Sequence, residues 1–409
     1  MPVNTRSTLS IVLAGGVGSR LHPLTEERTK PAVPIGGKYR IIDFALTNCL
    51  HSGLRRILVL TQYKSHSLQK HIRDGWSIFN PELGEYITTV PPQMRTGDMW
   101  YRGTADAIYQ NLYLLERSGA KQVVILPGDH IYRMDYAPMV TAHIEKKADL
   151  TVACMKVPLA EAHHFGIMSL DQQHRITTFH EKPETPEPME EDSGSAMASM
   201  GIYVFTLKRL IEILKEDHHK NDSSHDFGND IIPRLIKTHA VQAYPFGGAR
   251  GRVSQDSYWR DVGTLDSYYQ ANMDLLQETP PMNLYQDNWP IRTYSGQNPP
   301  ARTVPGVLGN EGISINSITA SGVTIAGGSV QHSILFTNVH VGDEAMVHDS
   351  LLFDDVKVGA GAELKNCIVD KGVVVPSGEI IGYDEKHDRQ RFTISPQGII
   401  VVPKGYQFN

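Results

Sequence analysis

The C-terminal part of the sequence carries a repeat whose period restricts the fold more than any other feature of the chain. From residue 318 onward, related positions recur at steps of six, six and five residues, so the pattern advances by 17 residues at a time. These positions are Ile318, Thr324, Val330, Leu335, Val341, Val347, Leu352, Val358, Leu364, Val369, Val375 and Ile381, and only Thr324 is not aliphatic. An amphipathic helix repeats at about 3.6 residues and does not produce this period. A three-sided coil with one inward residue per face does, and four such coils would bury a continuous aliphatic stack.

Small or polar residues fall at the corners of this pattern, where a coil has to turn. Gly342 and Gly359 lie at one corner, and Asn338, Asp355 and Gly372 lie at another. The pattern resembles the left-handed hexapeptide β-helix, and we interpret residues 301–409 as such a domain with a role in packing and assembly. Hexapeptide acyltransferases use the same coil. A second active site is therefore the alternative, which the short repeat disfavours and the histidines within it leave open.

The N-terminal part begins with a short apolar run and a glycine-rich turn. Residues 10–13 are typical of a strand, and Gly15, Gly16 and Gly18 follow at once. Glycine permits a sharp turn and a close approach of backbone N–H groups to an anion, while Arg20 and Lys30 add two cations. The stretch therefore predicts a phosphate cradle, with a plain tight turn as the alternative. It has neither the ending of a Walker loop nor the glycine spacing of the dinucleotide fingerprint.

Strand-like and helical segments alternate from about residue 9 to residue 153, which predicts an α/β domain with a mostly parallel sheet. Ligands of such sheets bind beyond the carboxyl ends of the strands. Asp129 follows the apolar run 123–126 and is expected at that edge, and Asp261 is a second candidate. Paired carboxylates there would suit Mg2+, which prefers oxygen ligands. The alternatives are a turn cap for Asp129 and a helix cap or an ion pair for Asp261.

Residues 279–300 carry five prolines and are interpreted as a domain linker. Trp289, Ile291 and Tyr294 would be costly to leave in water, so we expect this linker to pack against a domain.

Several motifs together resemble the sugar-nucleotide pyrophosphorylases and, among them, the bacterial glucose-1-phosphate adenylyltransferases. The resemblance runs from about residue 9 to the C-terminus. The matching stretches are residues 10–21 with Lys30 and Pro31, then 100–107, 128–132, 165–168, 181–183, 199–205, 223–233 and 258–264.

The resemblance implies a Rossmann-like nucleotidyltransferase domain in residues 1–279, a linker in residues 280–300 and the β-helix in residues 301–409. It implies transfer of AMP from ATP to glucose 1-phosphate with release of pyrophosphate, for glycogen synthesis. Asp129, Arg20 and Lys30 are then expected to be catalytic, and Asp129 and Asp261 to hold Mg2+. The expected substrate residues are Gly15, Gly16, Gly18, Arg20 and Lys30 for ATP, and Tyr101, Gly166, Glu181, Lys182 and Ser199 for glucose 1-phosphate.

The resemblance also implies an allosteric homotetramer that binds phosphorylated metabolites between its domains. Arg28 and Arg40 belong to a basic group near the glycine-rich turn and are the first candidates for the effector site. Arg117 is the next candidate. A solvated basic surface is the alternative. Where enteric members carry a lysine and a histidine, this chain has Glu27 and Pro34, so the effector is expected to differ from theirs.

Composition excludes several other classes of function. The formal net charge of −6 gives no basic field for nucleic acid, and no apolar run is long enough to span a membrane. Three widely separated cysteines argue against a disulfide framework or a zinc site, and with no signal peptide we expect a cytoplasmic protein. Two alternatives remain: a pyrophosphorylase for another base or sugar, and a non-catalytic regulatory subunit of the same fold. Such subunits usually lose the charged phosphate-site residues, which this chain retains.

Overall fold

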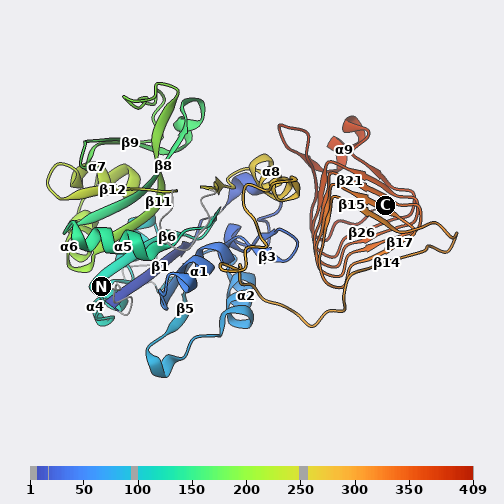
Figure 1. The fold of residues 1–409 in the computed structure, drawn as a ribbon, viewed down its shortest axis with the longest axis horizontal. Coiled ribbons are helices and arrows are strands. Elements are labelled where there is room, and N and C mark those ends of the chain that lie inside the picture. The colour runs from blue at the N-terminus through green and yellow to red at the C-terminus, as the bar shows by residue number, and fades with distance from the viewer. Residues whose placement is uncertain (1–6, 17, 94–99, 248–256, 409) are drawn as a thin grey trace.

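The computed structural model describes residues 7–16, 18–93, 100–247 and 257–408 and consists of a sheet-based domain followed by a β-helix (Figure 1). Nine strands of the described chain form the main sheet. Its order is β10 (Ile176–Glu181), β9 (Gly166–Leu170), β11 (Ser195–Thr206), β6 (Gln122–Pro127), β1 (Thr8–Ala14), β4 (Arg56–Thr61) and β5 (Tyr86–Val90), while β8 (Leu150–Pro158) pairs with β11 and with β12 (Val241–Pro245).

β1, which leads into the glycine-rich turn, and the strands beside it are parallel, as predicted. β1 runs parallel to β4 and β6, and β4 runs parallel to β5. The carboxyl ends of these four strands therefore meet at one edge of the sheet. The sheet is mixed beyond β6, because β11 is antiparallel to β6, β8 and β9. The α/β prediction is confirmed.

Helices cover both faces of the sheet, so its central strands are apolar on both sides. Leu9 and Ile11 of β1 belong to one apolar cluster, whereas Val12 and Ala14 belong to another. This split follows from the alternation of side chains along a strand. The helices of this domain are α1 (Ile42–His51), α2 (His66–Trp76), α3 (Thr104–Tyr109), α4 (Leu112–Arg117), α5 (Tyr136–Glu145), α6 (Leu207–His218), α7 (Ile232–Leu235) and α8 (Leu265–Met273).

The C-terminal domain is a left-handed β-helix with three parallel faces. The first face is β14 (Arg302–Val304), β17 (Thr324–Ala326), β20 (His340–Val341), β23 (Lys357–Val358) and β26 (Val374–Val375). The second is β15 (Ile313–Ile315), β18 (Ser329–Gln331), β21 (Met346–His348), β24 (Glu363–Lys365) and β27 (Ile380–Ile381). The third is β16 (Ile318–Thr319), β19 (Ile334–Leu335), β22 (Leu351–Leu352), β25 (Cys367–Val369), β29 (Ile400–Val402) and β28 (Thr393–Ile394), the last of these antiparallel.

The register confirms the period of 17 on the second face, where Val330 pairs with Val347 and Val347 with Leu364. Asn338 and Asp355 adopt left-handed φ angles of 60° and 64°, as a sharp corner requires. Asn and Asp tolerate this conformation better than most residues.

The prediction was wrong about the start of the repeat. Val341 pairs with Ile325 and not with Thr324, and Leu335 pairs with Thr319 and not with Ile318. The turn between Ile325 and Val330 is one residue shorter than the turn between Val341 and Val347 in the next coil. Ile325 is therefore the inward residue of this coil, and it is 1% exposed. The repeat also extends beyond the four expected coils: β14 and β15 precede it, and β29 continues the third face after α9 (Glu385–Arg391).

The segment between the domains packs as expected. Residues 280–300 contain no helix or strand. Trp289 is fully buried and donates from Nε1 to Asn48 Oδ1 at 3.2 Å, and Ile291 is buried as well. Tyr294 differs from the expectation, because 48% of it is exposed.

The domains also touch directly. Tyr268 of α8 packs edge-on against Phe353 of the β-helix, with ring centroids 6.5 Å apart. Arg28 Nη2 lies 2.9 Å from Asp370 Oδ1, and Lys404 pairs with Glu27. The helices of the described chain are all too short or too polar to cross a bilayer.

Candidate functional site

A cavity of about 660 Å³ opens where β1 and β6 end. One side is formed by the glycine-rich turn, and the other by β11 and the segment that follows α6. Predicted residues among its lining are Gly15, Gly16, Gly18, Arg20, Lys30, Tyr101, Asp129 and Glu181. The strand-edge rule therefore predicted that several of these residues come together at one cavity.

The glycine-rich turn is shaped by close backbone contacts. Gly18 has a φ of 66° and begins the short helix η2 (Ser19–Leu21), and a Cβ added to Gly18 would lie 3.1 Å from the Cβ of Lys30. A Cβ at Gly16 would meet no atom of the described residues within 4 Å, so this backbone faces open space among them. Val17 lies outside the described residues. Arg20 is exposed beside Gly263 and reaches the cavity.

Lys30 joins the two candidate metal-binding aspartates. Its Nζ lies 2.8 Å from Asp129 Oδ2 and 2.9 Å from Asp261 Oδ1. The aspartates come together because β13 (Trp259–Asp261) pairs antiparallel with β7 (His130–Tyr132), which sets Asp261 opposite His130. Burial opposes the charge of Lys30, but the two carboxylates outweigh it and raise its pKa. Burial likewise opposes ionisation of Asp129, yet the Lys30 ammonium lowers the pKa of this carboxyl.

Asp129, His130 and Asp261 form a group that fits a metal ion, since their ligand atoms lie within 4.8 Å of one another. His130 Nε2 is 3.7 Å from Asp129 Oδ1 and 3.9 Å from Asp261 Oδ1. Two carboxylates are the oxygen donors that a hard divalent cation prefers. Sequence analysis missed His130, whose place became apparent only from the β7–β13 pairing.

Tyr101 and Glu181 lie on the opposite side of the cavity. The Tyr101 hydroxyl accepts a hydrogen bond from Asn111 Nδ2 at 3.0 Å. Burial raises the pKa of the Glu181 carboxyl, and nearby Asp226 raises it further, while Lys182 lowers it. Glu181 is packed closely, because a Cβ at Gly166 would lie 2.8 Å from its Oε2 and one at Gly228 only 2.3 Å away.

Three predicted sugar-side residues stand behind or beside the cavity wall and do not line it. Gly166 pairs with Glu181 across β9 and β10. Lys182 is exposed, with its Nζ 3.4 Å from Glu181 Oε1. Ser199 Oγ accepts a hydrogen bond from Gly201 N at 3.2 Å, and Gly201 lines the cavity.

Asp226 is a cavity residue that the sequence analysis did not single out. Its Oδ1 accepts a hydrogen bond from Gly228 N at 2.8 Å, and its Oδ2 accepts one from Thr104 Oγ1 at 3.0 Å. It lies in the stretch 223–233, which matched the family motifs. The available signal was an aspartate two residues before a glycine, and on its own this indicates only a turn.

Comparison with known proteins extends these observations to the whole chain. Residues 9–278 match the family described as Nucleotidyl transferase, and residues 299–402 match the one described as GlmU-like, C-terminal hexapeptide. The chain is 62% identical over 404 residues to glucose-1-phosphate adenylyltransferase 2 of Vibrio cholerae, covering 99% of each chain. It is 48% identical over 398 residues to glucose-1-phosphate adenylyltransferase of Methylococcus capsulatus, covering 97% of this chain and 93% of the relative. The chain belongs to the glucose-1-phosphate adenylyltransferase family.

Nucleotidyltransferases generally use a divalent metal, and the donors around Asp129 and Asp261 suit one. The candidate effector residues of this family member lie in two places. Arg28 and Arg40 are at the domain junction: Arg28 pairs with Asp370, and Arg40 donates from Nη1 to Ala32 O at 2.7 Å. Arg117 is exposed at the end of α4, on the side of the catalytic domain away from the β-helix (Figure 1).

Proposed function

We propose that this protein transfers AMP from ATP to glucose 1-phosphate, forming ADP-glucose and pyrophosphate for glycogen synthesis. The observation that carries the proposal is the convergence of Lys30, Asp129 and Asp261 beside a glycine-rich turn, across one cavity from Glu181. Non-catalytic members of this fold usually lose those charged residues. We assign catalysis to residues 1–279, the connection to residues 280–300 and assembly to residues 301–409.

The nucleotide side of the site binds and orients the triphosphate. Backbone N–H groups at Gly15, Gly16 and Gly18 line the phosphate-facing turn, while Arg20 and Lys30 supply positive charge. A phosphate oxygen of the sugar attacks the α-phosphorus, and the bond from that phosphorus to the bridging oxygen of the pyrophosphate breaks. The nucleophile is already anionic, so no general base is needed. Positioning and charge neutralisation supply most of the acceleration.

Asp129 and Asp261 would hold Mg2+, which when bound neutralises charge on the phosphates. Before substrates bind, Lys30 fixes the spacing of these carboxylates by pairing with both. It thereby offsets their mutual charge repulsion until a metal ion takes its place between them.

The sugar side orients glucose 1-phosphate for attack. Tyr101, Glu181 and Asp226 present hydroxyl and carboxylate oxygens to the cavity, which suits recognition of sugar hydroxyl groups. Lys182 stands at the rim as a point charge for the sugar phosphate, and Gly166 and Ser199 support the wall behind.

Regulation by phosphorylated metabolites is the second part of the proposal, in a homotetramer. Arg28 and Arg40 would bind the effector at the domain junction, together with Lys371 of the β-helix, and Arg117 would act from elsewhere. Lys371 pairs with Asp354, and burial lowers its pKa to about 8. Because Arg28 and Lys371 are already paired with carboxylates, a phosphorylated ligand has to displace Asp370 or Asp354.

The test is pyrophosphate release from each of the four nucleoside triphosphates, with glucose 1-phosphate and Mg2+. We expect release with ATP well above that with the other three. Preference for UTP or dTTP would favour the alternative of another sugar-nucleotide pyrophosphorylase. No release with any triphosphate or sugar phosphate would favour a non-catalytic subunit.

A further inference from the structure

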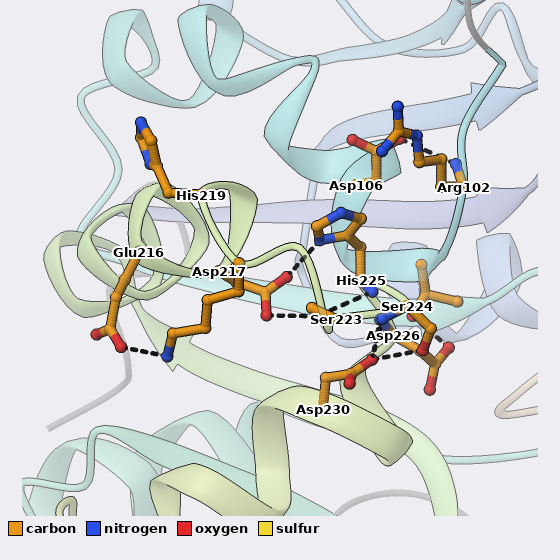
Figure 2. Close-up of polar contacts among 12 residues, drawn as sticks. Arg102, Asp106, Glu216, Asp217, His219, Ser223, Ser224, His225, Asp226 and Asp230 are labelled. Carbon is orange, nitrogen blue, oxygen red and sulfur yellow. Dashed lines mark hydrogen bonds and ion pairs between the residues drawn. The ribbon is translucent and has the colours of Figure 1, made fainter.

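A buried hydrogen-bond network stands behind the sugar side of the cavity, outside the residues assigned to substrates. It joins the end of α6 to the segment 223–226 that leads into the π-helical turn η6 (Phe227–Ile231) (Figure 2). At its centre His225 Nδ1 lies 2.8 Å from Asp217 Oδ2. His225 is 6% exposed and Asp217 is 3% exposed, so water does not weaken this contact.

Asp217 holds the segment through several donors at once. Its Oδ1 accepts a hydrogen bond from Ser223 Oγ at 2.8 Å and lies 3.1 Å from Arg234 Nη2. Ser223 Oγ in turn accepts a hydrogen bond from the backbone N–H of His225 at 3.1 Å. Because its carboxylate is buried and accepts from several donors, Asp217 restricts the position of the segment 223–226.

The backbone of His225 is also under constraint. Its φ of 57° lies in the left-handed region, which is unfavourable for a residue with a Cβ unless its surroundings hold it there. Its carbonyl accepts a hydrogen bond from Ala105 N at 2.9 Å, in the first turn of α3. Gly103 permits this approach, because a Cβ there would lie 2.3 Å from that carbonyl oxygen.

The consequence reaches the cavity one residue later. Asp226 faces the cavity and accepts a hydrogen bond from Thr104 of α3, and two residues further Gly228 lies against Glu181. The positions of the Asp226 and Glu181 carboxylates therefore depend on the position of the segment 223–226. We propose that Asp217 and His225 are positioning residues whose hydrogen bond aligns Asp226 and Glu181 for the sugar of glucose 1-phosphate. This inference rests on the proposed function and deepens it on the sugar side.

The test compares His225→Gly with His225→Asn. Glycine adopts the left-handed backbone freely but lacks the ring, so the variant removes the contact without adding backbone strain. Asparagine tolerates the same φ and keeps an N–H donor for Asp217. We expect His225→Gly to raise the KM for glucose 1-phosphate about tenfold, as for one lost hydrogen bond to a charged group, with the KM for ATP nearly unchanged. We expect His225→Asn to recover most of this loss.

Discrimination among sugars gives a readout that a purely structural role would not change. We expect His225→Gly to lower the ratio of kcat/KM for glucose 1-phosphate over galactose 1-phosphate. Asp217→Ala should have at least the same effect, because it also removes the contacts with Ser223 and Arg234. The double variant should be no worse than Asp217→Ala, because the His225 ring acts through its contact with Asp217. The matched control is His219→Ala, since His219 lies at the same end of α6 and its ring points away from the segment (Figure 2).

Several outcomes would overturn the inference: equal increases in both KM values, loss of thermal stability with unchanged KM values and sugar preference, or effects that add in the double variant. If His225→Gly does not fold, Ser223→Ala removes a milder part of the same network and should raise the KM for glucose 1-phosphate alone. An unchanged KM in that variant would then refute the role. Activity of the wild-type protein tests the proposed function separately, so the two failures are distinguishable.

Discussion

Replacing Lys30 by methionine tests the assembly of the catalytic centre most sharply. The side chain keeps its approximate size and loses its charge, so Asp129 and Asp261 face each other without a cation. Their oxygens lie no more than 4.8 Å apart. At that distance two unit charges repel by about 1 kcal/mol in water and by about 3 kcal/mol at an effective dielectric constant of about 20. Both carboxylates are partly exposed, so the repulsion should fall between these limits.

Two effects of opposite sign should follow. Turnover should fall by about 100-fold to 1,000-fold, the usual loss when one stabilising group is removed from a developing charge. Binding of Mg2+ without nucleotide should become tighter, because no internal cation competes for the oxygens. Steady-state assays measure the first, and the Mg2+-dependent shift in Tm measures the second. The control is Lys70→Met, which removes an exposed ion pair with Asp74 on α2. Near-normal turnover, or weaker Mg2+ binding, would refute the reasoning.

The remaining predictions concern the sugar phosphate, the regulatory junction and the β-helix. Lys182→Gln should raise the KM for glucose 1-phosphate strongly and that for ATP little, and equal losses would contradict its assignment. Arg40→Ala should blunt the response to fructose 6-phosphate, fructose 1,6-bisphosphate, AMP or phosphate in activity titrations, and a response like that of wild type would exclude this site. Val347→Ala should lower the free energy of unfolding by about 2 kcal/mol in urea titrations, because Val347 is fully buried in the aliphatic stack, and no change would contradict that packing. Burial lowers the pKa of Lys371 from 10.5 to about 8, so between these values the unfolded chain binds more protons and stability should rise with pH relative to Lys371→Met; a constant difference would contradict this.

Sequence reasoning was most successful where a pattern has one physical interpretation. The period of 17 predicted three buried columns, and the register confirms them from Val330, Leu335 and Val341 onward. The error at Thr324 arose because a constant step was carried through a turn that is one residue shorter. The sequence carried a signal of this shift, because Thr324 was the only non-aliphatic position of the pattern and its neighbour Ile325 is aliphatic. The pairing of Ile325 with Val341 of the next coil confirms it.

The candidate site was predictable to the extent that its residues lie at strand ends. The glycine-rich turn and Asp129 follow β1 and β6, so the strand-edge rule brought them together. Asp226 was missed because its place depends on contacts with α3, more than a hundred residues earlier in the chain. Such a contact leaves no mark in the neighbouring sequence.

The central claim is tested most directly by following the α-phosphate of ATP. The protein should convert ATP labelled at that position, with glucose 1-phosphate and Mg2+, into labelled ADP-glucose and an equal amount of unlabelled pyrophosphate. Asp129→Asn should lose this conversion by several orders of magnitude while remaining folded, since it removes a charge proposed to hold Mg2+. Label that stays in ATP or appears in free AMP in the wild-type reaction, or near-normal ADP-glucose formation by Asp129→Asn at saturating Mg2+, would contradict the account.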